Sequence, residues 1–365
     1  MTWIKNLKDS VMKIRNPVFL LLFTASLSAW AQPHKGCVAI FHESTPISIE
    51  VDLPEFKGGT LQTTQFQFTN KPTNLQPDES GRYCYHMSDP RFAFVHTFYY
   101  AVKEIEDYNR IFGKLGIPLK KTLSWHVLKN ATHPSTGTAT GGVTYPETAP
   151  DPSLIQHEIG HWVQAVANQE CENCNSDSLS EGSANLLAAL HSGDSIIGRH
   201  DGYAFAYDIN LFVRLPDYII TYRNTLERII EDPITERKYP AEIKQIRDMF
   251  ELAKTNPDME AWMRSENPYT TSDAINQPLW FAAINFGAES IKLIYVKTLS
   301  MLNKKQEYTY SEVAQITLQN ANEVNPAIAS YLTNEYIKRG VLTSTMKAHS
   351  KWHRGYQFDF THRPT

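Results

Sequence analysis

The residues best suited to chemistry in this chain of 365 residues lie in one short string, His157-Glu158-Ile159-Gly160-His161. On a helix, His157 and His161 lie four residues apart on the same face, so their imidazoles can bind one metal ion. Glu158 lies next to the first histidine, where its carboxylate can take a proton from metal-bound water. The alternative interpretation is a helix with two surface histidines and a glutamate.

The flanking residues predict the helix that this string requires. Asp151 has the side chain of an N-cap, and Pro152 suits the first helical position because its missing N–H needs no partner there. Apolar residues then recur at helical spacing and form a face for the core; they are Ile155, Ile159, Trp162, Val163 and Val166. The two histidines and Glu158 fall largely off this face, so they can line a cleft.

A tetrahedral catalytic zinc ion needs a third protein ligand and an open position for water. A second helix is predicted over residues 178–190, stopped near Gly193, and Glu181 in its first turn is the expected third ligand. A helical hairpin would bring this turn beside the first helix. Asn185 lies one turn later and can form a hydrogen bond with a ligand histidine. Glu181 could instead be an ordinary first-turn acid favoured by the helix dipole.

These motifs resemble those of the gluzincin metallopeptidases, specifically the thermolysin-like branch, because nineteen residues separate His161 from Glu181. The resemblance implies zinc bound by His157, His161 and Glu181, with Glu158 as general base in peptide-bond hydrolysis. It also implies an α+β fold of two lobes, β-rich and then helical, with the active-site helix between them. The family generally has an aspartate where this chain has Asn185, which would polarise the ligand histidine less.

Two further segments carry parts of the resemblance that concern substrate binding. Asn130-Ala131 is similar to the pair with which the family holds the substrate backbone beside an edge strand; a turn asparagine is the alternative. Arg214 is similar to the family's arginine that binds a substrate carbonyl, and a solvated or salt-bridged arginine is the alternative. The acidic calcium-binding loops of the family are not recognisable.

The family stabilises the oxyanion of the transition state with a histidine, and the corresponding stretch here, residues 267–280, contains none. Two alignments are possible, and they place Tyr269 or Ala274 at the histidine position. We expect Tyr269, because a phenol can donate a hydrogen bond to an oxyanion and alanine cannot. If Ala274 is the counterpart, the protein would bind zinc with little or no catalytic activity.

The N-terminus is typical of an export signal. Four basic residues precede an apolar run over residues 18–29, and Ala29-Trp30-Ala31 matches a signal-peptidase site. Cleavage there predicts a periplasmic or secreted protein without a stable membrane anchor; an uncleaved anchor is the alternative. Little of the chain remains before the predicted catalytic lobes, so we expect no long inhibitory propeptide.

The four cysteines of an exported protein predict two disulfides. Cys171 and Cys174 lie close enough in sequence to pair locally between the two predicted zinc helices. Cys37 and Cys84 would then pair with each other. A redox or metal-binding role for the CxxC pair is the alternative.

Charge and composition limit the possible partners. The net charge is −4, and without residues 1–31 the chain carries 31 basic against 38 acidic side chains, which argues against a nucleic-acid-binding protein. The expected partner is a peptide or protein substrate, and a monomer is expected. The aromatic and basic residues 348–365 form a tail that is either a docking strip or a loosely held terminus.

Hydrophobic patterning divides the chain into a signal peptide (1–31), a β-rich lobe (32–150), a helical lobe with the zinc site (151–347) and the tail (348–365). Strands are expected within residues 38–85, including Phe66-Gln67-Phe68, and at 123–128 and 138–145, the last as a cleft edge. Helices are expected at 92–112, 240–254, 278–302 and 311–322, and in a segment opened by Asn325-Pro326 and closed by Gly340.

The leading hypothesis is therefore an exported zinc metalloendopeptidase. One rival is a zinc-bound, catalytically weak relative that serves as a binding or scaffold protein. A second rival is an amidase that acts on a cell-wall peptide. All three share the zinc site, so they differ only in what the site does.

Overall fold

A computed structural model describes most of the chain between residues 34 and 342. The described ranges are 34–42, 45–56, 60–70, 75–119, 121–127, 135–138, 141–144, 151–168, 177–197, 207–209, 221–231, 240–264, 272–302 and 308–342. They form a mixed α+β fold, as the sequence predicts. Residues 1–31 and the tail at 348–365 lie outside these ranges, so the predicted signal peptide and tail stay predictions.

The first sheet has three strands. β1 (Lys35–His42) and β2 (Thr45–Asp52) form an antiparallel hairpin, and the short β4 (Arg82–Tyr83) pairs in parallel with β1, giving the order β2-β1-β4. A disulfide between Cys37 and Cys84 joins β1 to the residue after β4, which confirms one of the two predicted disulfides.

The second sheet has four strands in the order β3-β5-β7-β6. β3 (Phe66–Phe68), β5 (Leu123–Val127) and β7 (Gly141–Thr144) are parallel, and β6 (Ser135–Thr138) is the antiparallel edge strand. The strand predicted over residues 138–145 is confirmed as β7, whereas β6, which ends at Thr138, was not predicted as a separate strand. That segment contains the end of β6 and all of β7, because the glycine-rich sequence reverses direction between Thr138 and Gly141.

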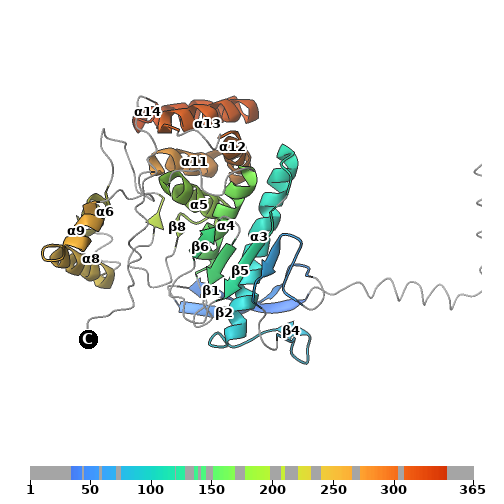
Figure 1. The fold of residues 1–365 in the computed structure, drawn as a ribbon. Helices are drawn as coiled ribbons and strands as arrows, with labels where there is room; N and C mark the ends of the chain where they lie inside the picture. The colour runs from blue at the N-terminus through green and yellow to red at the C-terminus, as the bar shows by residue number, and fades with distance from the viewer. Residues whose placement is uncertain are drawn as a thin grey trace, which may run out of the picture.

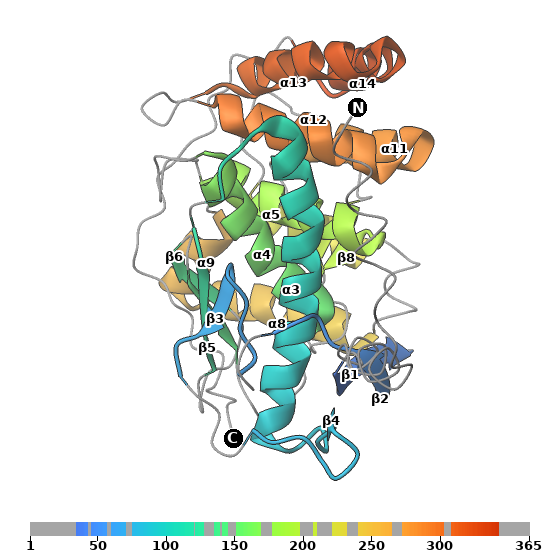
Figure 2. The same cartoon turned by 90° about the vertical axis from the view of Figure 1, so that its right-hand side faces the viewer.

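The longest helix, α3 (Pro90–Leu115), confirms the helix expected at residues 92–112. Asp89 caps its start by accepting a hydrogen bond from the Arg91 N–H, and Gly116 ends it with a left-handed φ of 66°. Its apolar face contacts β1, α4 (Pro152–Ala167) and α12 (Ala288–Met301). Figure 2 shows α3 running past α4 from the β4 end of the molecule towards α12.

The helix predicted over residues 278–302 is two helices, α11 (Asp273–Phe286) and α12, so this prediction is wrong. Gly287 separates them with a φ of 92°, a conformation that a helix cannot contain. Pro278 lies inside α11 rather than at its start. A proline near the beginning of a helix removes only one backbone hydrogen bond, so buried packing around Pro278 can offset that loss.

The remaining predicted helices are confirmed. α5 (Asp177–Ser192), α8 (Pro240–Ala253), α13 (Tyr310–Val324) and α14 (Pro326–Lys338) lie where the sequence places them. Asn325 caps α14, and Gly340 follows it with a left-handed φ of 71°. Figure 1 shows α11 to α14 gathered on the side of α5 that faces away from the first sheet.

A small helical unit has its own apolar core. It consists of α6 (Tyr222–Glu231), α8 and α9 (Pro257–Arg264), and Figure 1 shows it at one side of the molecule. α6 and α9 are short and strongly amphipathic, and the sequence-based predictions did not include them. A two-stranded pairing of β8 (Ile196–Ile197) with β9 (Tyr207–Asp208) follows α5.

The main core is one cluster of buried apolar residues that extends from Leu53 to Val341 and includes α3, α4, α5 and α11 to α14. It spans both of the predicted lobes, whose division stays a prediction. Within the described ranges, no helix is both long and apolar enough to cross a membrane.

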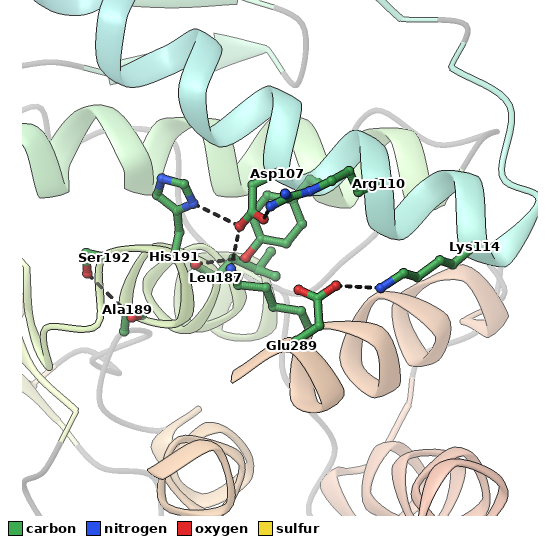
Figure 3. Close-up of polar contacts among 10 residues, drawn as sticks. Asp107, Arg110, Lys114, Leu187, Ala189, His191, Ser192 and Glu289 are labelled. Carbon is green, nitrogen blue, oxygen red and sulfur yellow. Dashed lines mark hydrogen bonds and ion pairs between the residues drawn. The ribbon is translucent and has the colours of Figure 1, made fainter. Parts of the chain in front are cut away.

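A buried ionic cluster ties three helices of this core together (Figure 3). Asp107 of α3 contacts His191 Nδ1 of α5 at 3.0 Å and the ammonium of Lys292 of α12. Arg110 reaches the same carboxylate from the surface. Burial opposes the ionisation of Asp107, but hydrogen bonds from His191, Lys292 and Arg110 outweigh it and lower the pKa of the carboxyl. The far end of α5 is thereby anchored to α3 and α12.

Candidate metal centre

The metal-binding string lies on α4, whose start has the predicted capping. The Asp151 carboxylate accepts a hydrogen bond of 2.9 Å from the Ser153 N–H, and Pro152 occupies the first turn. The apolar face of α4 is buried as predicted, but His157 and Glu158 are themselves only 7% and 6% exposed. The expectation that these side chains line a cleft stays a prediction; α4 itself packs against α3, α5 and α12.

The third ligand candidate comes from α5, whose contact with α4 is the most extensive between any two of the described helices. Glu181 lies in the first turns of α5, opposite His157 and His161. The hairpin of α4 and α5 brings Glu181 to the histidines across nineteen intervening residues, as the sequence analysis expected. Three potential ligands thus come from two helices.

Three ligand atoms of these side chains converge on one point. Glu181 Oε2 lies 3.2 Å from His157 Nε2 and 3.5 Å from His161 Nε2, and the two imidazole nitrogens are 3.2 Å apart. All candidate ligand atoms of the group lie within 4.8 Å of one another. This buried group could hold a metal ion.

The spacing of the three atoms can be compared with that of ligands around zinc. For a tetrahedral ion with bonds of about 2.0–2.1 Å, neighbouring ligand atoms lie about 3.3–3.4 Å apart, because the edge of a tetrahedron is about 1.6 times its centre-to-corner length. The three observed separations are 3.2, 3.2 and 3.5 Å, so each lies close to the distance expected between zinc ligands. The residues therefore fit a tetrahedral ion with one position left for another ligand.

The hydrogen bonds made by the Nδ1 atoms of His157 and His161 determine which ring nitrogens face Glu181. His157 Nδ1 lies 2.7 Å from Asn185 Oδ1, an atom that can only accept, so in the neutral ring Nδ1 carries the proton and Nε2 has the lone pair that a metal ion would take. His161 Nδ1 lies 3.3 Å from Ser180 Oγ, which orients the second ring in the same way. The backbone of Ser180 is itself held, because its carbonyl accepts a hydrogen bond of 2.9 Å from Gln164 Nε2.

Asn185 is the partner of a ligand histidine that the sequence predicts, whereas the contact of Ser180 with His161 was not predicted. A hydroxyl residue directly before the third ligand is a weak signal, because serine is common in the first turn of helices. Its role depends on how α5 lies against α4, which becomes visible only in three dimensions.

The charges of the cluster favour a cation among its three side chains. Burial favours the neutral imidazole, but the Glu181 carboxylate and the charge of Glu158 outweigh it and raise the pKa of His157 to about 9. Burial also opposes ionisation of Glu181, yet the charge of His161 and the approach of both imidazoles lower the pKa of Glu181. Positive charge is therefore stabilised at this point of the protein.

Two carboxylate oxygens of the site are buried and unsatisfied. Glu158 Oε2 and Glu181 Oε2 make no hydrogen bond within the part of the chain that the structure describes. A buried carboxylate oxygen normally has a partner, and a metal ion satisfies a ligand such as Glu181. The Glu158 carboxylate remains available to act as a base beside the cluster.

The contact between α5 and α11 brings the start of α11 beside the cluster. A side chain at Gly182 would overlap Ser272 Oγ, at 1.8 Å, and Asn276 Nδ2, at 2.5 Å. Ala274, one of the two candidates for the oxyanion position, is fully buried in the first turn of α11. The other candidate, Tyr269, precedes Ser272 by three residues and lies outside the described residues.

Several predicted residues fall in segments that the structure does not describe. These are the substrate-binding candidates Asn130, Ala131 and Arg214 and the cysteines Cys171 and Cys174. Their roles stay predictions.

Comparison of the sequence with known protein families and with curated proteins found no match. The resemblance to thermolysin-like gluzincins therefore rests on the spacing of the motif residues alone.

Proposed function

We propose that this protein is an exported zinc metalloendopeptidase. The observation that carries the proposal is the convergence of His157 Nε2, His161 Nε2 and Glu181 Oε2 at the spacing of tetrahedral zinc ligands. Histidine nitrogen and carboxylate oxygen are also the donor set that catalytic zinc takes.

The proposed chemistry divides between the ion and the chain. When bound, a zinc ion lowers the pKa of water and polarises a carbonyl oxygen. Glu158 would take the proton from the attacking water and pass it to the amine that leaves. Its unsatisfied, buried oxygen supports this role, because no described neighbour engages it. Asn185 and Ser180 would keep the two imidazoles in the orientation that ligation requires.

The remaining parts of the proposal follow from the family resemblance. Tyr269 would donate a hydrogen bond to the oxyanion, and Asn130, Ala131 and Arg214 would hold the peptide. A cleft between a β-rich and a helical lobe belongs to the same proposal.

Export is supported by the disulfide between Cys37 and Cys84. Structural disulfides persist in oxidising compartments and are rare in the cytosol. Together with the signal-like residues 1–31, this favours a periplasmic or secreted protein.

The proposal is tested first by the metal content of the full chain. We expect about one zinc ion per chain and loss of peptidase activity on chelation, restored by zinc. Less than stoichiometric zinc after careful loading would reject the peptidase and its two rivals together, because all share the site.

The second test separates an enzyme from a scaffold. Glu158→Gln keeps the shape of the side chain but removes the base, so peptide hydrolysis should fall by several orders of magnitude while zinc stays bound. Glu106→Gln, the same change at an exposed position of α3, is the matched control. Equal inactivity of wild type and variant on varied peptides would favour the scaffold, and cleavage confined to cell-wall peptides would favour the amidase.

A further inference from the structure

Gly160 lies between the two histidines of α4 and faces the backbone of Ala184 on α5. A Cβ built on Gly160 would lie 2.7 Å from Ala184 Cα, 2.8 Å from its carbonyl oxygen and 3.1 Å from its carbonyl carbon. These are backbone atoms, so no side-chain rotation can make room. Ala184 in turn lies between Glu181, the third ligand, and Asn185, the partner of His157.

We propose that Gly160 is a positioning residue of the metal centre, and that the absence of its side chain sets the separation of α4 and α5 at which Glu181 reaches both imidazoles. This inference rests on the proposed function, because it assumes that the three side chains bind a metal ion. The position of Gly160 between two ligand histidines does not by itself imply that it spaces the two helices.

The distances show why an added methyl group matters. Ordinary van der Waals contact begins at about 3.4 Å, so a Cβ at 2.7 Å from Ala184 Cα requires the two backbones to separate by about 0.7 Å. Metal–ligand distances tolerate deviations of only about 0.2 Å. A shift of α5 would carry Glu181 and Asn185 together, since both lie on the same rigid helix within one turn of Ala184.

Helix propensity does not explain why residue 160 is a glycine. The interior of a helix favours alanine over glycine, and Gly160 lies in the middle of α4 with ordinary helical conformation. A glycine of α3, Gly113, provides the contrast, because a Cβ there would have no atom within 4 Å. The two positions share helical backbone and differ in what an added methyl group meets.

The test compares Gly160→Ala with Gly113→Ala in the full chain. We expect Gly160→Ala to lower the affinity for Zn²⁺ at least tenfold in competition with a chelator, as other changes around metal ligands do. The visible absorption of the Co²⁺-loaded protein should weaken, because four-coordinate geometry is lost. Gly113→Ala should leave both measurements unchanged. Wild-type affinity and spectrum in Gly160→Ala would overturn the proposal, whereas failure of the wild type itself to bind metal would reject the proposed function.

A second measurement distinguishes positioning from a general loss of stability. If the site has widened, the preference for Cd²⁺ over Zn²⁺ should rise in Gly160→Ala, because the larger ion accepts longer bonds. Should this variant be unfolded without metal, saturating Cd²⁺ should restore more helical circular dichroism than Zn²⁺. An unchanged ratio, or equal restoration by both ions, contradicts the proposed role of Gly160.

Discussion

At the scale of single residues, the candidate metal centre depends on atoms that would not touch a bound ion. Asn185 is 2% exposed, and its Oδ1 holds the proton on His157 Nδ1. An amide does this without adding a negative charge. It therefore fixes the tautomer of His157 but leaves the imidazole a weaker donor than a carboxylate partner would.

Replacing Asn185 should reveal both effects. We expect Asn185→Ala to lower zinc affinity by about 10- to 100-fold, because the ring loses the partner that orients it. Asn185→Asp should bind zinc at least as tightly as wild type, since its carboxylate makes the imidazole more basic. Chelator competition measures both, with Asn285→Ala on the exposed side of α11 as the control. Weaker binding by Asn185→Asp than by Asn185→Ala would contradict this account.

Glu104 affects the stability of the fold rather than metal binding. Glu104 of α3 is fully buried, and neither of its carboxylate oxygens has a hydrogen-bond partner in the described parts of the chain. Burial raises its pKa well above 4.5; the charge of Lys292 opposes this effect, and that of Asp107 adds to it. Folded protein thus keeps a proton on Glu104 that unfolded protein releases above pH 4.5.

Because the pKa of Glu104 differs between folded and unfolded protein, the free energy of unfolding depends on pH. A raised pKa contributes stability that is complete below about pH 4.5 and is lost as the pH rises towards the folded value. In the zinc-free protein, the free energy of unfolding of Glu104→Gln relative to wild type should increase from pH 5 to pH 6, because wild type loses this contribution and the neutral amide does not. Urea unfolding at the two pH values measures this change. Glu106→Gln, exposed on the same helix, should show no such gain, and a gain of the same size there would refute the assignment.

At the scale of secondary-structure elements, the ligand helix α5 is held along its length by different contacts. Gly160 and Gly182 allow α4 and α11 to approach its first half. The cluster around Asp107 holds its last turn through His191 (Figure 3). Glu181 and Asn185 therefore lie on an element that neighbours constrain on several sides, as a preformed metal site requires.

Asp107→Asn should weaken this arrangement of helices strongly. It leaves the buried Lys292 ammonium without its carboxylate partner, which typically costs about 3–5 kcal/mol in the free energy of unfolding. The double change Asp107→Leu with Lys292→Met should lose much less, because no buried charge remains. Arg110→Gln should cost less than about 1 kcal/mol, since Arg110 is 70% exposed. Urea unfolding compares the three; equal losses would contradict a buried ion pair as the source.

At the scale of the whole molecule, one main core connects the first strands with the last helices. The disulfide between Cys37 and Cys84 ties the first sheet to the segment before α3 across 47 residues. The metal centre lies between α4 and α5 instead. The stability of the fold and the affinity of the site should therefore respond differently when this bond is removed.

The double variant Cys37→Ser with Cys84→Ser tests that separation. For a loop of this length, loss of the bond should lower the free energy of unfolding by about 4 kcal/mol, because the unfolded chain regains entropy. Zinc affinity of the folded protein should stay within about twofold, since β1 packs on α3, whereas the candidate ligands lie on α4 and α5. Chemical unfolding and chelator competition measure the two quantities. Loss of zinc binding in folded protein would show that the sheet and the site are coupled.

Many elements of this fold can be predicted from short stretches of sequence. The start of α4 follows from Asp151-Pro152, and α14 from Asn325-Pro326, because caps act through hydrogen bonds within one turn. The errors also have local causes. The break at Gly287 was hidden within a continuous apolar pattern, and the reversal between β6 and β7 lies in a glycine-rich segment without clear alternation.

Within the metal centre, the amino-acid sequence alone determines that His157 and His161 share one helical face, because four residues make about one turn. It also determines that a carboxylate follows on a second helix. Only the tertiary structure decides that Glu181 meets both imidazoles at ligand spacing, and that Ser180 and Asn185 turn the rings toward it. That convergence depends on how closely α4 and α5 pack. The proposed role of Gly160 follows from the same packing, because a side chain there would overlap the backbone of Ala184, twenty-four residues further along the chain.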